Sequence, residues 1–133
     1  DLNDYPKRRG VTRVKELLAN GNNVSFGHDD IFDPWYPLGS GNMRDVIHMG
    51  LHVCQMMGYQ EIMDSYRLCT HNAAKTLHLG ASYGIREGNP ASFIVLDGDN
   101  FYNALNKKGE ILYSYNRGRL IASAEPAVRK VMF

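Results

Sequence analysis

The residues of this sequence best suited to do chemistry are His28, Asp29 and Asp30, which directly follow a short apolar run. Two adjacent carboxylates repel each other, and burying either one costs several kcal/mol unless a cation or hydrogen-bond donors compensate. A divalent metal ion is one such cation, and Asp29 would give it a hard oxygen ligand that also accepts a proton from water. Alternatively, His28 and Asp29 cap a turn through backbone hydrogen bonds. The motif is short, but its position favours a functional site.

Trp35 is the only tryptophan of the chain and lies in the loop that follows these acids, between Pro34 and Pro37. A planar aromatic side chain above the acids would form a wall for a flat heterocycle. Alternatively, Trp35 anchors the loop by packing on the core. The pattern alone favours this second interpretation, because a tryptophan buries a large apolar area.

Other candidate ligands lack a complete motif. His48 and His52 are four residues apart and share a helix face, but no glutamate follows His48 as it does in an HExxH zinc site. Since they lie beside an apolar stripe, we expect histidines of the helix surface or of the edge of the core. Cys54 and Cys69 form no CxxC pair, and free thiols are the simpler interpretation. The HxE and PCxxC signature of the small zinc deaminases is absent from the sequence.

The elements that must position these residues follow from periodicity and capping signals. An amphipathic helix is predicted over 11–20, a short strand over 23–27, and a loop over 33–41. Further helices are predicted from an Asn42 cap to a stop at Gly58, over 61–69, and over 70–77. Strands are expected over 91–98, in a hairpin over 111–123 with its turn at 116–118, and over 128–133. His28, Asp29 and Asp30 therefore lie at the carboxyl end of a strand, where α/β enzymes place their chemistry.

Composition limits the partners. Apolar residues make up 44% and charged residues 22% of the 133 residues, which argues against disorder. The net charge of +1 gives no reason to expect nucleic acid or a membrane as a partner. No apolar stretch approaches the roughly 18 residues that span a bilayer. We expect a cytoplasmic protein by default, since neither a signal peptide nor a cysteine framework is visible.

Longer motifs carry a family resemblance. The run YPKRRGVTRVKELLANGNNVSFGHDDIFDPWYPLGSGNM resembles the last barrel unit and active-site loop of the bacterial cytosine deaminases, which belong to the amidohydrolase superfamily. HMGLHVCQMMGY and THNAAKTLHL resemble the helices that follow, YGIREGNPASFIVLDG the return strand, and NRGRLIAS the closing hairpin. The return strand usually carries an aspartate where this chain has Ser92.

The resemblance implies the α/β fold class, with residues 1–80 as the last part of a metal-dependent (β/α)₈ barrel. Residues 81–133 would be the carboxyl-terminal strands of a small β-sandwich domain. The family binds one divalent metal ion, iron or zinc, and replaces the C4 amine of cytosine with oxygen, giving uracil and ammonia. By resemblance, Asp29 is both a metal ligand and a catalytic residue, Asp30 lies beside the substrate, and Trp35 closes over the pyrimidine.

The remaining ligands and catalytic groups of the family have no counterpart in this sequence. A complete barrel takes about 250 residues, so we expect the 133-residue chain to be inactive alone, lacking an amino-terminal portion, or to act within a homo-oligomer. Two alternatives stay open. One is an amidohydrolase acting on another amino-heterocycle, such as isoguanine or a triazine, and the other is a non-catalytic interaction module.

Overall fold

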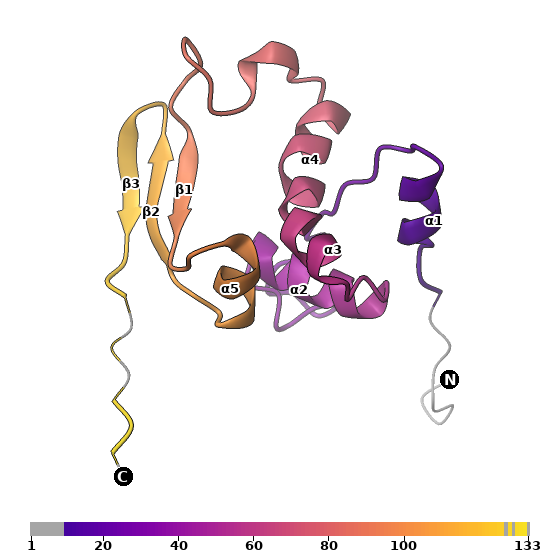
Figure 1. Ribbon diagram of the computed structural model, residues 1–133, viewed down its shortest axis with the longest axis horizontal. Helices are drawn as coiled ribbons and strands as arrows, with labels where there is room; N and C mark the ends of the chain where they lie inside the picture. The colour runs from indigo at the N-terminus through magenta and orange to yellow at the C-terminus, as the bar shows by residue number, and fades with distance from the viewer. Residues whose placement is uncertain (1–9, 127, 129, 133) are drawn as a thin grey trace.

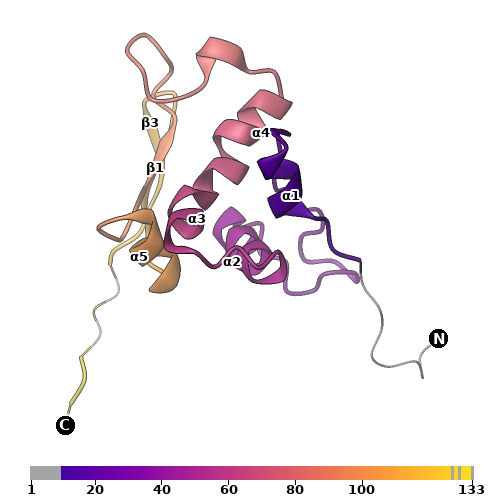
Figure 2. The same ribbon diagram turned by 45° about the vertical axis from the view of Figure 1, so that its right-hand side comes forward.

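The computed structural model describes residues 10–126, 128 and 130–132, in which helices precede a small sheet. The elements are α1 (Val14–Ala19), α2 (Met43–Val53), α3 (Tyr59–Asp64), η1 (Ser65–Cys69), α4 (His71–Thr76), η2 (Gly80–Ser82), β1 (Phe93–Leu96), α5 (Phe101–Asn106), β2 (Ile111–Asn116) and β3 (Arg119–Ser123). In both views α3 and α4 stand between the sheet and α1 (Figures 1 and 2). None of the described helices has the length and apolar character needed to cross a membrane.

Of the helices expected from periodicity, α2 forms where the apolar stripe and a side-chain cap coincide. The side chain of Asn42 accepts a hydrogen bond from the backbone N–H of Arg44 at 3.1 Å, and α2 begins at the next residue, Met43. Asp45 lies in the first turn, where a negative charge is stabilised by the helix dipole. The prediction of a capped helix after Asn42 is confirmed.

Four helices end in a residue with a left-handed backbone, and only one of these residues is a glycine. They are Gly21, Gln55, His78 and Lys108, with φ of 77°, 56°, 55° and 51°. The predicted end of α2 at Gly58 is wrong. The N–H of Gln55 bonds the carbonyl of His52 at 3.2 Å and the N–H of Met56 bonds that of Leu51 at 2.8 Å, which is a Schellman motif. This turn ends α2 early and buries Met56.

Gln55→Gly is therefore expected to stabilise the protein. Gln55 is exposed, so its side chain packs little, whereas its left-handed conformation costs about 1 kcal/mol that glycine does not incur. The free energy of unfolding should rise by about 1 kcal/mol in a urea titration followed by circular dichroism. Gln55→Ala is the matched control and should give no gain. An equal gain in both variants would mean that the turn is not strained.

The three strands form one antiparallel sheet in the order β1-β2-β3, as the sequence predicted for 111–123. Arg117 and Gly118 both have positive φ, so the β2–β3 turn has the mirror-image geometry that matches strand twist. The hydroxyl oxygen of Ser92 accepts a hydrogen bond from the backbone N–H of Arg117 at 3.0 Å, a bond that the family's usual aspartate could also make. The strand expected over 128–133 falls partly outside the described residues, and its described residues form no strand.

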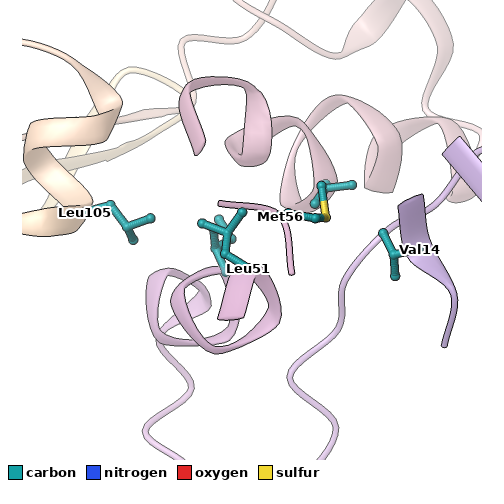
Figure 3. Packing of buried hydrophobic residues seen from close by; sticks show 6 residues of the cluster. Val14, Leu51, Met56 and Leu105 are labelled. Carbon is teal, nitrogen blue, oxygen red and sulfur yellow. The ribbon is translucent and has the colours of Figure 1, made fainter. Parts of the chain in front are cut away.

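One hydrophobic core joins elements from both halves of the chain. Its buried members are Val14, Ile47, Leu51, Met56, Leu68 and Leu105. Leu51 and Leu105 face each other across α2 and α5, and Val14 approaches from the side of α1 (Figure 3). The helical part and the segment between β1 and β2 therefore share apolar packing.

α5 was not predicted from the sequence. It is capped by Asn100, whose side-chain oxygen accepts a hydrogen bond from the N–H of Asn103 at 2.9 Å. The ring centroids of Tyr59 and Tyr102 lie 5.3 Å apart, which joins α5 to α3. After the helix, the carbonyl of Gly109 accepts a hydrogen bond from the guanidinium of Arg44 on α2. These contacts fix α5 against the helical layer.

The strand predicted over 23–27 is not assigned in the structure. The segment is held by hydrogen bonds to helical residues instead of by a neighbouring strand: the amide of Asn72 on α4 donates to the carbonyl of Val24 at 2.8 Å. The N–H of Phe26 donates to the carbonyl of Leu68 at 3.0 Å. A β-strand requires a ladder of backbone hydrogen bonds with another strand, and no described segment of the chain supplies one here.

Candidate functional site

The backbone changes direction at Asp29, where the segment that enters from Val24 ends. Asp29 has φ of 66°, a left-handed conformation that few residues other than Gly, Asn and Asp adopt readily. Its side chain is exposed, and within the described part of the chain no hydrogen bond or ion pair engages its carboxylate. The carboxylate is therefore available to a ligand.

Asp29 lies on a groove of about 670 Å³ between the segment 24–29 and α2. The α2 wall is apolar and consists of Val46, Met49 and Val53, and the opposite wall includes Val24 and Phe26. Met49 and Val53 are about half exposed, at 54% and 48%. The acid thus stands at the edge of a hydrophobic groove, a combination that is typical of small-molecule sites.

Asp30 differs from Asp29 in its surroundings. It is half-buried, and this desolvation is the main cause that raises the pKa of its carboxyl group above the ordinary value. The negative charges of Asp29 and Asp33 raise the pKa further, because each disfavours a second charge nearby. A carboxyl group with a raised pKa holds its proton more readily, which suits Asp30 to donate a hydrogen bond to a ligand.

The loop that follows presents its aromatic side chains to solvent. Trp35 is 86% exposed, so the interpretation of this residue as an anchor packed on the core is wrong. The loop is instead held by its backbone: Asp33 Oδ1 accepts hydrogen bonds from the N–H groups of Trp35 and Tyr36 at 2.9 and 2.8 Å. Phe32 and Leu38 are exposed to a similar degree, 84% and 85%. An ordered backbone thus carries large apolar side chains that are free to cover a ligand.

His28 has a role that its position in the sequence did not reveal. Its Nδ1 lies 2.9 Å from the carbonyl oxygen of Asp30, and its Nε2 accepts a hydrogen bond from the N–H of Gly41 at 3.0 Å. The ring also packs against Tyr36, with centroids 5.8 Å apart. The turn-capping interpretation therefore holds for His28 but not for the side chain of Asp29. The partner at Gly41 is distant along the chain, so no local motif predicts it.

The other candidate ligands do not complete a metal site with Asp29 within the described part of the chain. His48 and His52 are exposed on α2, with ring centroids 5.0 Å apart, as expected for surface histidines. Cys54 and Cys69 are free thiols; burial raises the pKa of Cys54, and that of Cys69 to about 11. Among the described residues no three His, Cys, Asp or Glu side chains gather into a metal site. Asp29 could therefore supply one ligand of a metal ion but not a complete coordination shell.

Comparison with known proteins gives a consistent result. A sequence model of the amidohydrolase family matches residues 1–122 of the chain. The 5-methylcytosine deaminase of Klebsiella pneumoniae liganded with phosphonocytosine is 43% identical, with a TM-score of 0.87 over 97% of this chain and 32% of that one. The same enzyme liganded with 5-fluorocytosine gives a TM-score of 0.86 over 98% of this chain and 31% of that one, again at 43% identity.

Two more distant relatives carry a different name. The N-isopropylammelide isopropylaminohydrolase of Burkholderia multivorans ATCC 17616 has a TM-score of 0.79 over 89% of this chain and 30% of that one, but at 22% identity it shares the fold alone. The N-isopropylammelide isopropyl amidohydrolase of Pseudomonas sp. (strain ADP) is 26% identical over 115 residues, 86% of this chain and 28% of that protein. The chain thus spans about a third of the length of its relatives.

Proposed function

We propose that the complete protein is a metal-dependent hydrolase that deaminates cytosine. The premise of this proposal is that the chain belongs to the amidohydrolase family, as its motifs predicted. The C4 amine is replaced by oxygen, which gives uracil and ammonia. The observation that carries this proposal is the 43% identity over almost the whole chain to an enzyme whose structures hold phosphonocytosine and 5-fluorocytosine. Residues 1–80 would form the last part of the barrel and 81–133 strands of the β-sandwich.

Asp29 would be the catalytic residue that this chain contributes, and one ligand of the metal ion. The fit rests on its donor chemistry: an exposed carboxylate without a protein partner among the described residues, at the edge of an apolar groove. A divalent ion, iron or zinc, would supply Lewis acidity and lower the pKa of a bound water molecule. Asp29 itself would accept the proton of the attacking water at a carboxylate oxygen and return it toward the departing amine.

Asp30 and Trp35 would bind the substrate. The raised pKa of Asp30 favours a shared proton between its carboxyl group and a ring nitrogen or amine of the base. Trp35 is exposed on a backbone fixed by Asp33, so its indole can cover a flat ring without a change in the loop backbone. Both side chains follow Asp29 directly in the same loop.

The surface of the chain supports a larger assembly. Among the described residues, the large apolar side chains of Phe32, Leu38 and Ile85 are 84%, 85% and 87% exposed. The groove beside Asp29 is also open. Further polypeptide, either an amino-terminal portion or another subunit, would cover the groove and provide the missing ligands.

The test is the release of ammonia, or of isopropylamine in the case of N-isopropylammelide, by the complete protein, loaded with Fe²⁺ or Zn²⁺. Cytosine should be the best of four substrates: cytosine, 5-methylcytosine, isoguanine and N-isopropylammelide. Faster turnover of one of the others would reassign the substrate within the family. The 43% identity to the Klebsiella enzyme makes 5-methylcytosine the second candidate, and the 26% identity to the Pseudomonas enzyme makes N-isopropylammelide the third. No turnover of any of them by the metal-loaded protein would favour the non-catalytic interaction module.

A further inference from the structure

We propose that His28 is a positioning residue and does not bind metal. Its two ring nitrogens hold the two ends of the loop from Asp30 to Gly41 together through hydrogen bonds, and we call this arrangement the clamp. Both ring nitrogens are already engaged by backbone groups at the two ends of this loop, at 2.9 and 3.0 Å. The expected effect of His28 on substrate binding rests on the proposed function. The hydrogen bonds of its ring rest on the geometry alone.

The two partners define the protonation of the ring. The backbone N–H of Gly41 can only donate, so Nε2 must present its lone pair. The carbonyl of Asp30 can only accept, so the proton must lie on Nδ1. The lone pair of Nε2 that a metal ion would need is therefore already used by the N–H of Gly41.

The clamp acts on a loop end that has little freedom to relax. A Cβ atom at Gly39 would lie 2.5 Å from the carbonyl oxygen of Asp30, so the backbone approaches that oxygen closely. The N–H of Gly39 bonds the carbonyl of Tyr36 at 2.9 Å, and the ring of Tyr36 packs on His28. One imidazole thus joins the start, the middle and the end of the loop.

The position of the clamp determines what it controls. Asp29 lies between His28 and Asp30, and Trp35 lies inside the closed loop. Without the clamp, Gly41 would be released from His28, and the backbone that carries Trp35 would lose its fixed end. We expect weaker substrate binding with the chemical step largely preserved, because the acid that does the chemistry stays in place.

Three substitutions in the complete metal-loaded enzyme separate the two bonds. His28→Ala removes both. In His28→Gln the amide oxygen can reach the place of Nε2 and accept from Gly41, and in His28→Asn the amide nitrogen can reach the place of Nδ1 and donate to Asp30. KM for cytosine should rise about tenfold in the alanine variant and about threefold in the other two, with kcat within about threefold of wild type. The metal content should not change.

A spectroscopic measurement decides the bonding independently of catalysis. In ¹⁵N-histidine-labelled wild-type enzyme, the signal that disappears in His28→Gln should show a protonated Nδ1 and an unprotonated Nε2. The amide of Gly41 should exchange more slowly with deuterium in wild type than in His28→Ala. The ¹⁵N measurement tests the hydrogen bonds of His28 even if cytosine proves not to be the substrate, or if His28→Ala does not fold.

Two results would overturn the inference. A protonated Nε2 in wild type would exclude the hydrogen bond to Gly41. Loss of bound metal in all three variants, together with a fall in kcat and an unchanged KM, would make His28 a ligand instead of a clamp.

Discussion

Asp29→Asn is expected to reduce kcat for cytosine by at least about a thousandfold in the complete enzyme while leaving the fold intact. The amide has the shape of the carboxylate but carries no charge to hold a cation and no basic oxygen to accept a proton. Asn is also one of the few residues that tolerates the left-handed backbone, φ of 66°, found at Asp29. The substitution therefore removes the chemistry without adding backbone strain.

Ammonia release, metal content and thermal unfolding should be measured on the same preparation of Asp29→Asn. Asp99→Asn is the matched control, because it removes the same charge from an exposed loop away from the groove and should keep wild-type turnover. Wild-type turnover in Asp29→Asn would mean that the catalytic carboxylate lies elsewhere, and a lower unfolding temperature in that variant alone would point to a structural role.

Leu51→Ala should lower the free energy of unfolding by about 2–5 kcal/mol. Leu51 is 3% exposed and belongs to the same buried cluster as Leu68 of η1 and Leu105 of α5. Truncation removes apolar area from three elements at once and leaves a cavity that the helices cannot close without moving. For a chain of this length that loss is a large fraction of the total stability.

Urea unfolding followed by circular dichroism, with Ile85→Ala as the control, measures the effect of Leu51→Ala. Ile85 is 87% exposed, so its truncation should change the free energy of unfolding by less than about 0.5 kcal/mol. A loss below about 1 kcal/mol in Leu51→Ala would show that the core does not join the three elements.

The helices and the hairpin could be predicted because their signals are local. Asn42 caps α2 through its own side chain, and the apolar residues of α2 recur at helical spacing. The turn of the hairpin depends on Gly118, which adopts positive φ without strain. In each case the residues that determine the element are its immediate neighbours.

Elements defined by distant contacts could not be predicted in the same way. The left-handed residues Gln55, His78 and Lys108 carry no conformational signature, because ordinary residues adopt that backbone only when packing compensates the cost. α5 is short, and its apolar face is defined by α3 and the core rather than by a repeating pattern. A strand over 23–27 requires a partner strand that the described residues do not contain.

In the candidate site, too, features set by neighbouring residues could be predicted, whereas features set by distant contacts could not. Asp29 lies at the edge of a groove, as the strand-end rule led us to expect, although the segment before it is not assigned as a strand. The function of His28 depends on Gly41, a contact that loop closure creates and spacing does not encode. For Trp35, composition favoured burial, whereas the structure leaves its side chain exposed and holds the loop through the side chains of Asp33 and His28.

The docking of α5 has a practical consequence for dividing this polypeptide into complementing halves. The chain passes from helices to strands near residue 80, so this boundary is the first place one would cut the chain to make a split-protein reporter. A cut there would separate Leu105 from the apolar pocket beneath α2 and Arg44 from the carbonyl of Gly109. Each half would expose an apolar surface that packs against the other half. These contacts would drive reassembly, so no fused dimerisation domain would be needed.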